Sequence, residues 1–109
     1  MMTSKERFMR IMVFFDLPTT SKTDRKNATK FRNALLNEGY YMMQWSVYSR
    51  ICKGVAEVEK HSRRLKGLIP PAGSVRLMSV TERQFADMEI LVGESPKTEK
   101  IGAKQLLLF

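Results

Sequence analysis

Hydrophobic residues in the first part of the chain form a continuous run, which is followed by a segment with helical spacing. Residues 8–15, FMRIMVFF, are apolar at both alternating sets of positions apart from Arg10, as in a strand that is covered on both faces. From Ser21 to Gly39, apolar residues recur at about 100° per residue on one side of a predicted helix. They are Ala28, Phe31, Ala34 and Leu35. Ser21 and Asp24 have capping-box spacing, and Gly39 stands where a left-handed C-terminal cap is expected.

The remaining chain continues with predicted strands and helices. Residues 40–52, YYMMQWSVYSRIC, predict one long strand because they are rich in aromatic and β-branched residues. One face of this strand would carry Tyr41, Met43, Trp45, Val47 and Ile51, and the other Gln44, Ser46, Tyr48 and Arg50. Further predicted elements are a helix over 54–67, a turn over 70–73, a strand over 74–80, a short helical turn that begins with the capping-box pair Thr81 and Gln84, a strand over 89–93 and an apolar terminal strand over 105–109.

This order of elements predicts an α+β, ferredoxin-like fold with two helices on one face of an antiparallel sheet. Because the first strand has no polar face, the open side of the sheet must also be covered. We therefore predict a homodimer with two sheets face to face and the helices outside. Residues 1–93 are predicted to form the domain, and 94–109 a flexible link and C-terminal strand. The pattern leaves open whether that strand joins its own sheet or is exchanged onto the partner's sheet.

The length and composition exclude several classes of protein. The 109 residues suit one domain, and no run approaches the roughly 20 apolar residues of a membrane span. Cys52 is the only cysteine, which excludes a disulfide framework and a cysteine-based zinc site. No segment has the pattern of a signal peptide, so a cytoplasmic protein is expected.

Positive charge is the strongest compositional signal. Nineteen Lys and Arg against eleven Asp and Glu leave a net charge of +8, with a pI near 9.9. Such a field attracts polyanions, of which nucleic acid is the commonest, whereas a membrane surface is disfavoured without an amphipathic basic terminal helix. The predicted outer side of the first helix carries the cations Lys22, Arg25, Lys26, Lys30 and Arg32. We expect them to contact phosphates without sequence preference.

Asp16 raises a separate question, because an apolar strand ends on this carboxylate just before Leu17 and Pro18. Asp16 could cap the turn before the proline. Alternatively, in a dimer the two Asp16 carboxylates would be brought together across the two-fold axis and would repel each other, and a shared Mg²⁺ would relieve that repulsion. Water on such an ion can attack a phosphodiester.

The other polar side chains are interpreted structurally. The only histidine, His61, is expected at a solvated helix position. Cys52 is expected to be a small strand residue. Packing and hydrogen bonding are the expected roles of Ser46 and Tyr48, although both could reach the dimer seam near Asp16.

Several segments together resemble the family of CRISPR-associated protein 2, the small subunit of the spacer-acquisition complex. They are RIMVFFDLPT, the basic helix, EGYYMMQWSVYSR and VTERQF. The sequence of these segments is similar to that of the branch of the family that accompanies single-protein RNA-guided nucleases. The resemblance implies a homodimer that bridges copies of the integrase subunit, CRISPR-associated protein 1, and supports a DNA duplex. Many relatives are described as divalent-metal-dependent endoribonucleases or deoxyribonucleases. By this likeness Asp16 would be the Mg²⁺-binding and catalytic residue, paired with its symmetry mate.

Two other functions stay open at this point. One is a stand-alone endoribonuclease of the related bacterial toxin type, which shares the fold and the strand-end aspartate. The other is a non-catalytic regulatory module that binds a small ligand or another protein. Whether RNA or DNA would be cut is also open.

Overall fold

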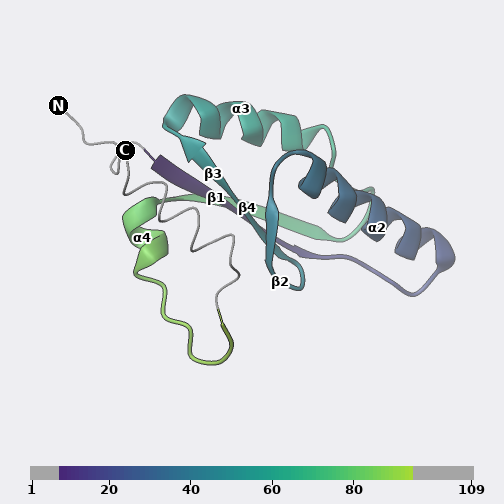
Figure 1. The fold of residues 1–109 in the computed structure, drawn as a ribbon. Coiled ribbons are helices and arrows are strands. Elements are labelled where there is room, and N and C mark those ends of the chain that lie inside the picture. The colour runs from purple at the N-terminus through teal and green to yellow at the C-terminus, as the bar shows by residue number, and fades with distance from the viewer. Residues whose placement is uncertain (1–7, 95–109) are drawn as a thin grey trace.

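β1 (Phe8–Asp16) lies at the centre of an antiparallel sheet, between β3 (Val47–Lys53) and β4 (Ser74–Thr81). β2 (Tyr41–Gln44) extends the sheet beyond β3, so the strand order is β2-β3-β1-β4. The computed structural model describes residues 8–94. Its helices are α2 (Lys22–Asn37), α3 (Val55–Lys66) and α4 (Glu82–Ala86). Figure 1 shows α2 and α3 on one side of the sheet and α4 on the other. The predicted ferredoxin-like α+β fold is confirmed.

The core lies between the sheet and the helices α2 and α3. Alternate residues of β1 point into it, and Ile11 and Val13 are fully buried there. Phe15, the next residue of this set, packs edge-on against Phe31 of α2, with 5.1 Å between the ring centroids. Leu65 contributes the buried contact from α3. The apolar spacing of the sequence therefore identified the inner face of α2, whereas β1 is apolar on both faces and only the structure shows which of its residues point into this core.

Both predicted helix starts have the expected caps. Ser21 and Asp24 form a reciprocal capping box at α2, and Thr81 and Gln84 form another at α4. Gly39 follows α2 with a φ of 88°, and a Cβ there would clash with the guanidinium of Arg50. This glycine therefore serves both the left-handed backbone and the close approach of Arg50.

The predicted single strand over 40–52 is wrong. The chain reverses at Trp45 and Ser46, and β2 pairs with β3 in antiparallel register through Tyr41↔Ser49 and Met42↔Tyr48. Ser46 has a φ of 71°, the only positive φ of a non-glycine residue within 8–94. The turn carries no glycine, proline or asparagine, and its one turn-favouring residue, Ser46, is a weak signal by itself. As a consequence, Trp45 is not on a strand face but is 73% exposed.

The other side of the sheet, here called the open face, carries the second set of β1 side chains. They are Arg10, Met12, Phe14 and Asp16. α4 packs on this face at the start of β1, where Glu82 and Phe85 contact Arg10. Beyond α4 the face is less covered, and Met78 of β4, which pairs with Met12, is 49% exposed. One end of this apolar surface is therefore covered within the chain itself.

The predicted strand over 89–93 is also wrong. Residues 88–94 form no strand, and Leu91 and Val92 are 87% and 94% exposed. Both neighbours of β1 are already taken by β3 and β4, so this segment would have to pair at the free edge of β2 or β4, which it does not. The predicted terminal strand over 105–109 lies outside the described residues. No helix within 8–94 is both long and apolar enough to cross a membrane.

Candidate nucleic-acid and metal site

Asp16 is the last residue of β1, where it pairs with Ser74 of β4 and is exposed. Within residues 8–94 its carboxylate accepts no hydrogen bond and forms no ion pair, so no turn-capping contact to Pro18 is present. Gly73, with a φ of 99°, packs directly on this strand end, since a Cβ there would lie 2.7 Å from the Asp16 carbonyl oxygen. The turn before β4 therefore positions the backbone and leaves the carboxylate available.

One chain alone provides few ligands for a metal ion. Among the residues that the structure describes, no three His, Cys, Asp or Glu side chains lie together. Mg²⁺ keeps several waters and is commonly held by one or two carboxylates plus phosphate oxygens. An exposed, unpaired Asp16 fits such a hydrated ion when a second carboxylate or a phosphate completes the site.

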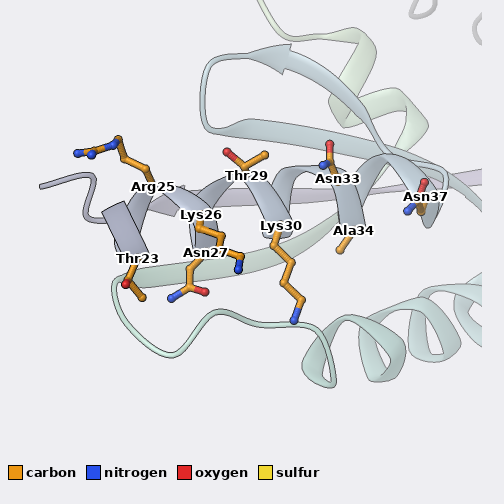
Figure 2. A pocket seen from close by; sticks show the side chains of 9 residues that line it. All are labelled: Thr23, Arg25, Lys26, Asn27, Thr29, Lys30, Asn33, Ala34 and Asn37. Atoms are coloured by element: carbon orange, nitrogen blue, oxygen red, sulfur yellow. The ribbon is translucent and has the colours of Figure 1, made fainter. Parts of the chain in front are cut away.

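The outer surface of α2 supplies positive charge. Lys22, Lys26 and Lys30 are exposed. An open depression runs along this surface and has no acidic residue in its lining, which consists of Thr23, Arg25, Lys26, Asn27, Thr29, Lys30, Asn33, Ala34 and Asn37. Figure 2 shows Lys26 and Lys30 pointing to the same side of the helix, whereas Arg25 extends away from them. Ammonium and amide groups spaced along one helix are suitable donors to a phosphate backbone.

Arg25 also has a structural contact. Its guanidinium donates to the carbonyl oxygens of Thr19 and Thr20, at 3.1 Å each. It thereby holds the loop between β1 and α2 while remaining exposed.

The placement of Arg32 on the outer side of the helix is wrong. Arg32 follows Lys30 by two residues and is therefore turned by about 160° around α2. It is half-buried beside the β2–β3 turn, where its Cζ lies 3.6 Å from the Trp45 ring centroid and 4.9 Å from that of Phe15. Its Nη2 donates to the Ser46 hydroxyl at 3.2 Å. The exposed tryptophan attracts the guanidinium to this flank.

The structure also decides the roles of the other polar residues. His61 is buried, which corrects the predicted solvated position. Burial lowers the pKa of its imidazole, and the nearby charges of Arg50 and Lys60 lower it further. Cys52 is a buried strand residue as predicted, and burial raises the pKa of its thiol. Tyr48 packs in the core, in agreement with the prediction.

Two features of the structure were missed by sequence reasoning. One is the stack of Arg32 on Trp45, and the other is the buried ion pair between Arg10 and Glu82. The isolated charge of Arg10 within an apolar strand was a usable signal, because a buried arginine requires a carboxylate partner. The Trp45 stack had no such signal, since it depends on the weakly marked turn.

Comparisons with known proteins agree with the fold and with the quoted segments. A sequence model of the family described as CRISPR associated protein Cas2 matches residues 9–88. A protein of Acidovorax ebreus (strain TPSY) named CRISPR-associated endoribonuclease Cas2 is 52% identical over 102 residues, covering 93% of this chain and all of the relative. A protein of the same name from Campylobacter jejuni is 45% identical over 106 residues, which is 96% of this chain and 74% of that protein.

A solved structure described as "Crystal structure of cas2" supports the fold. It superposes with a TM-score of 0.54 at 20% identity and covers 81% of this chain and 90% of its own. Together, the family match over most of the chain and the relatives of high identity show that this chain belongs to the CRISPR-associated protein Cas2 family.

Proposed function

We propose that this protein is a dimeric, basic scaffold that supports a DNA duplex during CRISPR spacer acquisition in the cytoplasm and bridges copies of the integrase subunit, CRISPR-associated protein 1. The observation that carries the proposal is the outer surface of α2, where Lys22, Lys26 and Lys30 are exposed beside a depression without acidic residues. These groups are suited to phosphates and not to base edges, so binding would be independent of sequence.

The dimer is supported by the open face of the sheet. α4 covers only the end near Arg10, whereas Met78 remains half exposed and the aromatic side chain of Phe14 is only partly buried. Apolar residues that alternate toward one face of a sheet are typical of a surface that packs against another sheet. A second copy placed there would turn both α2 helices outward and double the positive charge available to DNA.

Asp16 is the proposed ligand of a divalent cation, shared with its symmetry mate. Its carboxylate is exposed and unpaired within the described part of the chain. When bound, Mg²⁺ would supply charge stabilisation at a phosphate oxygen and an acidified water. The chain itself contributes the negative charge at the strand end and the adjacent turn at Gly73 that fixes the backbone there.

Co-purification tests the scaffold function directly. The full chain and the integrase subunit of the same system are expressed together, and the complex is given a labelled duplex and a repeat-containing plasmid. We expect a stable complex that inserts the duplex, and a complex without this chain should insert far less. Insertion at the same rate without this chain would contradict the proposal.

A second candidate function is metal-dependent RNA cleavage, which the names of the curated relatives favour. The variant Asp16→Asn removes the charge of the carboxylate and keeps its shape. We expect it to lose Mg²⁺-dependent cleavage and to keep the dimer and its duplex affinity, because Asp16 is not on the α2 surface. Cleavage assays with highly purified protein check this, and undiminished cleavage by the variant would place the activity elsewhere.

A further inference from the structure

Trp45 is unusually exposed for a tryptophan. It lies in the turn between β2 and β3 with 73% of its surface accessible, and it is flanked by Gln44 and Ser46. One face of the indole carries the Arg32 guanidinium, whose Cζ lies 3.6 Å from the ring centroid. With so much of the ring exposed, the face opposite Arg32 is open to solvent.

The tryptophan has a firm support. The Arg32 guanidinium lies over the Trp45 ring and over the Phe15 ring, and it also donates to the Ser46 hydroxyl. Phe15 in turn packs against Phe31 in the core. The chain therefore holds a large aromatic ring outward with a positive charge behind it, and little entropy remains to be lost on binding.

The turn also lies close to Asp16. The amide of Phe15 donates to the carbonyl oxygen of Ser46 at 3.1 Å, and Phe15 directly precedes Asp16. One backbone hydrogen bond thus joins the residue after Trp45 to the residue before the candidate metal ligand. The Asp16 carboxylate itself belongs to the open face, whereas Phe15 and Arg32 lie on the helix side of the sheet, so the backbone at the end of β1 joins the two positions without bringing the carboxylate against the indole.

We propose that Trp45, backed by Arg32, is a stacking site for an unpaired base of a single-stranded nucleic acid that passes the turn between β2 and β3. The inference rests on the proposed nucleic-acid function and adds to it a preference for unpaired strands at this end of the sheet. Exposed aromatic rings stack on any base because each base has a π-face, whereas bases inside a duplex have none free. The residues beside Trp45 are polar and a cation lies behind its ring, whereas a tryptophan at a protein–protein hot spot has apolar surroundings. These features favour a nucleobase over a protein partner as the group that stacks on the ring.

Tryptophan fluorescence tests this proposal without a label, because Trp45 is the only tryptophan in the chain. The full chain is titrated with an oligothymidylate of about 12 nucleotides, and separately with a blunt duplex that carries the same number of phosphates, at one salt concentration. We expect saturable quenching by the single strand. The duplex should bind, as measured by anisotropy of a labelled copy, without comparable quenching.

Variants then separate stacking from charge. Trp45→Ala should weaken single-strand binding by roughly 5- to 100-fold and leave duplex binding unchanged, and Trp45→Phe should restore much of the loss. Arg32→Gln, which removes the cation behind the ring, should weaken single-strand binding in the same direction. Val55→Ala removes a comparably exposed apolar side chain from α3 and should change neither affinity.

The outcomes distinguish this inference from the proposed function. Duplex binding without any quenching by the single strand would overturn the stacking site and leave the scaffold intact. Failure of both nucleic acids to bind would overturn the scaffold and the stacking site together. If Trp45→Ala changed the sedimentation of the protein but not its single-strand affinity, the tryptophan would be a protein contact and the stacking site would be rejected.

Discussion

Arg10 is the only charged residue in the strand 8–15, and its side chain is fully buried. Its Nε and Nη2 donate to the two carboxylate oxygens of Glu82, at 2.7 and 3.1 Å, and its Nη1 donates to the Tyr41 hydroxyl at 2.8 Å. The Phe85 ring centroid lies 4.1 Å from its Cζ. A buried charge is tolerated only with such partners, so this pair determines where α4 docks.

We predict that Glu82→Gln destabilises the protein by about 3–5 kcal/mol, because it leaves the Arg10 charge buried and unpaired. The double variant Arg10→Met with Glu82→Leu should recover most of this loss, since two apolar side chains of similar volume need no partner. Urea denaturation at one protein concentration measures both effects. A double variant as unstable as Glu82→Gln would contradict the electrostatic explanation.

At the scale of elements, α3 places His61 in an environment that opposes its charge. The Nδ1 of its buried imidazole has no hydrogen-bond partner. Arg50 on β3 and Lys60 and Arg64 on α3 lower its pKa, in addition to the larger effect of burial, whereas Glu57 raises it. The neutral imidazole is therefore the form that this packing accepts.

This environment predicts a pH dependence. Because the folded-state pKa of His61 is below its ordinary value of 6.5, the unfolded chain binds the proton first. The free energy of unfolding should therefore fall as the pH is lowered from about 7 to about 5. Denaturation of the wild type and of His61→Gln over this range measures the effect, and the variant should show the shallower dependence.

A second group titrates in a separate window. Glu38 has a pKa below its ordinary value of 4.5, chiefly because it accepts hydrogen bonds from Arg64. Its stabilising effect is lost as the pH falls through that lowered pKa, and because the charge of His61 is among the causes that lower it, the comparison for His61 is made at pH 5 and above. Equal slopes for wild type and His61→Gln above pH 5 would show that the histidine does not couple to folding.

At the scale of the whole molecule, the net charge of +8 favours binding to any polyanion. A test must therefore separate the effect of where the cations lie, on α2, from the effect of the total net charge. Replacing Lys22, Lys26 and Lys30 together by Ala should reduce the log–log salt slope of duplex binding by about 0.9 for each phosphate that the variant no longer neutralises. A matched triple variant on α3 removes the same charge by changing Lys60, Arg63 and Lys66 to Ala.

Fluorescence anisotropy at several salt concentrations, with two unrelated duplex sequences, checks this prediction. The α2 variant should lose more affinity than the α3 variant, and by the same factor for both sequences. Equal losses in the two variants would mean that net charge and not the α2 surface determines binding. A wild-type affinity that is independent of salt would favour a small-ligand regulator instead.

Much of the fold could be predicted because it depends on the pattern of residues that are close together in the sequence. The apolar run of β1, the apolar stripe of α2 and both capping boxes depend on residues a few positions apart. The long strand over 40–52 failed for the same reason, since its alternation runs on through Trp45 and Ser46 without a glycine, proline or asparagine. The exposed Asp16 at the end of β1 was predicted correctly as a position, whereas its role stays a prediction.

The sequence by itself determined the two long helices, the buried side of α2, the positive charge and the carboxylate at the strand end, because each depends on neighbours along the chain. Only the tertiary structure decided which distant side chains meet. It brought Glu82 onto Arg10, buried His61 beside Arg50, and set Arg32 beneath Trp45. The physical reason is that burial, desolvation and ring stacking depend on separation in space, which the spacing of residues in a single sequence does not encode.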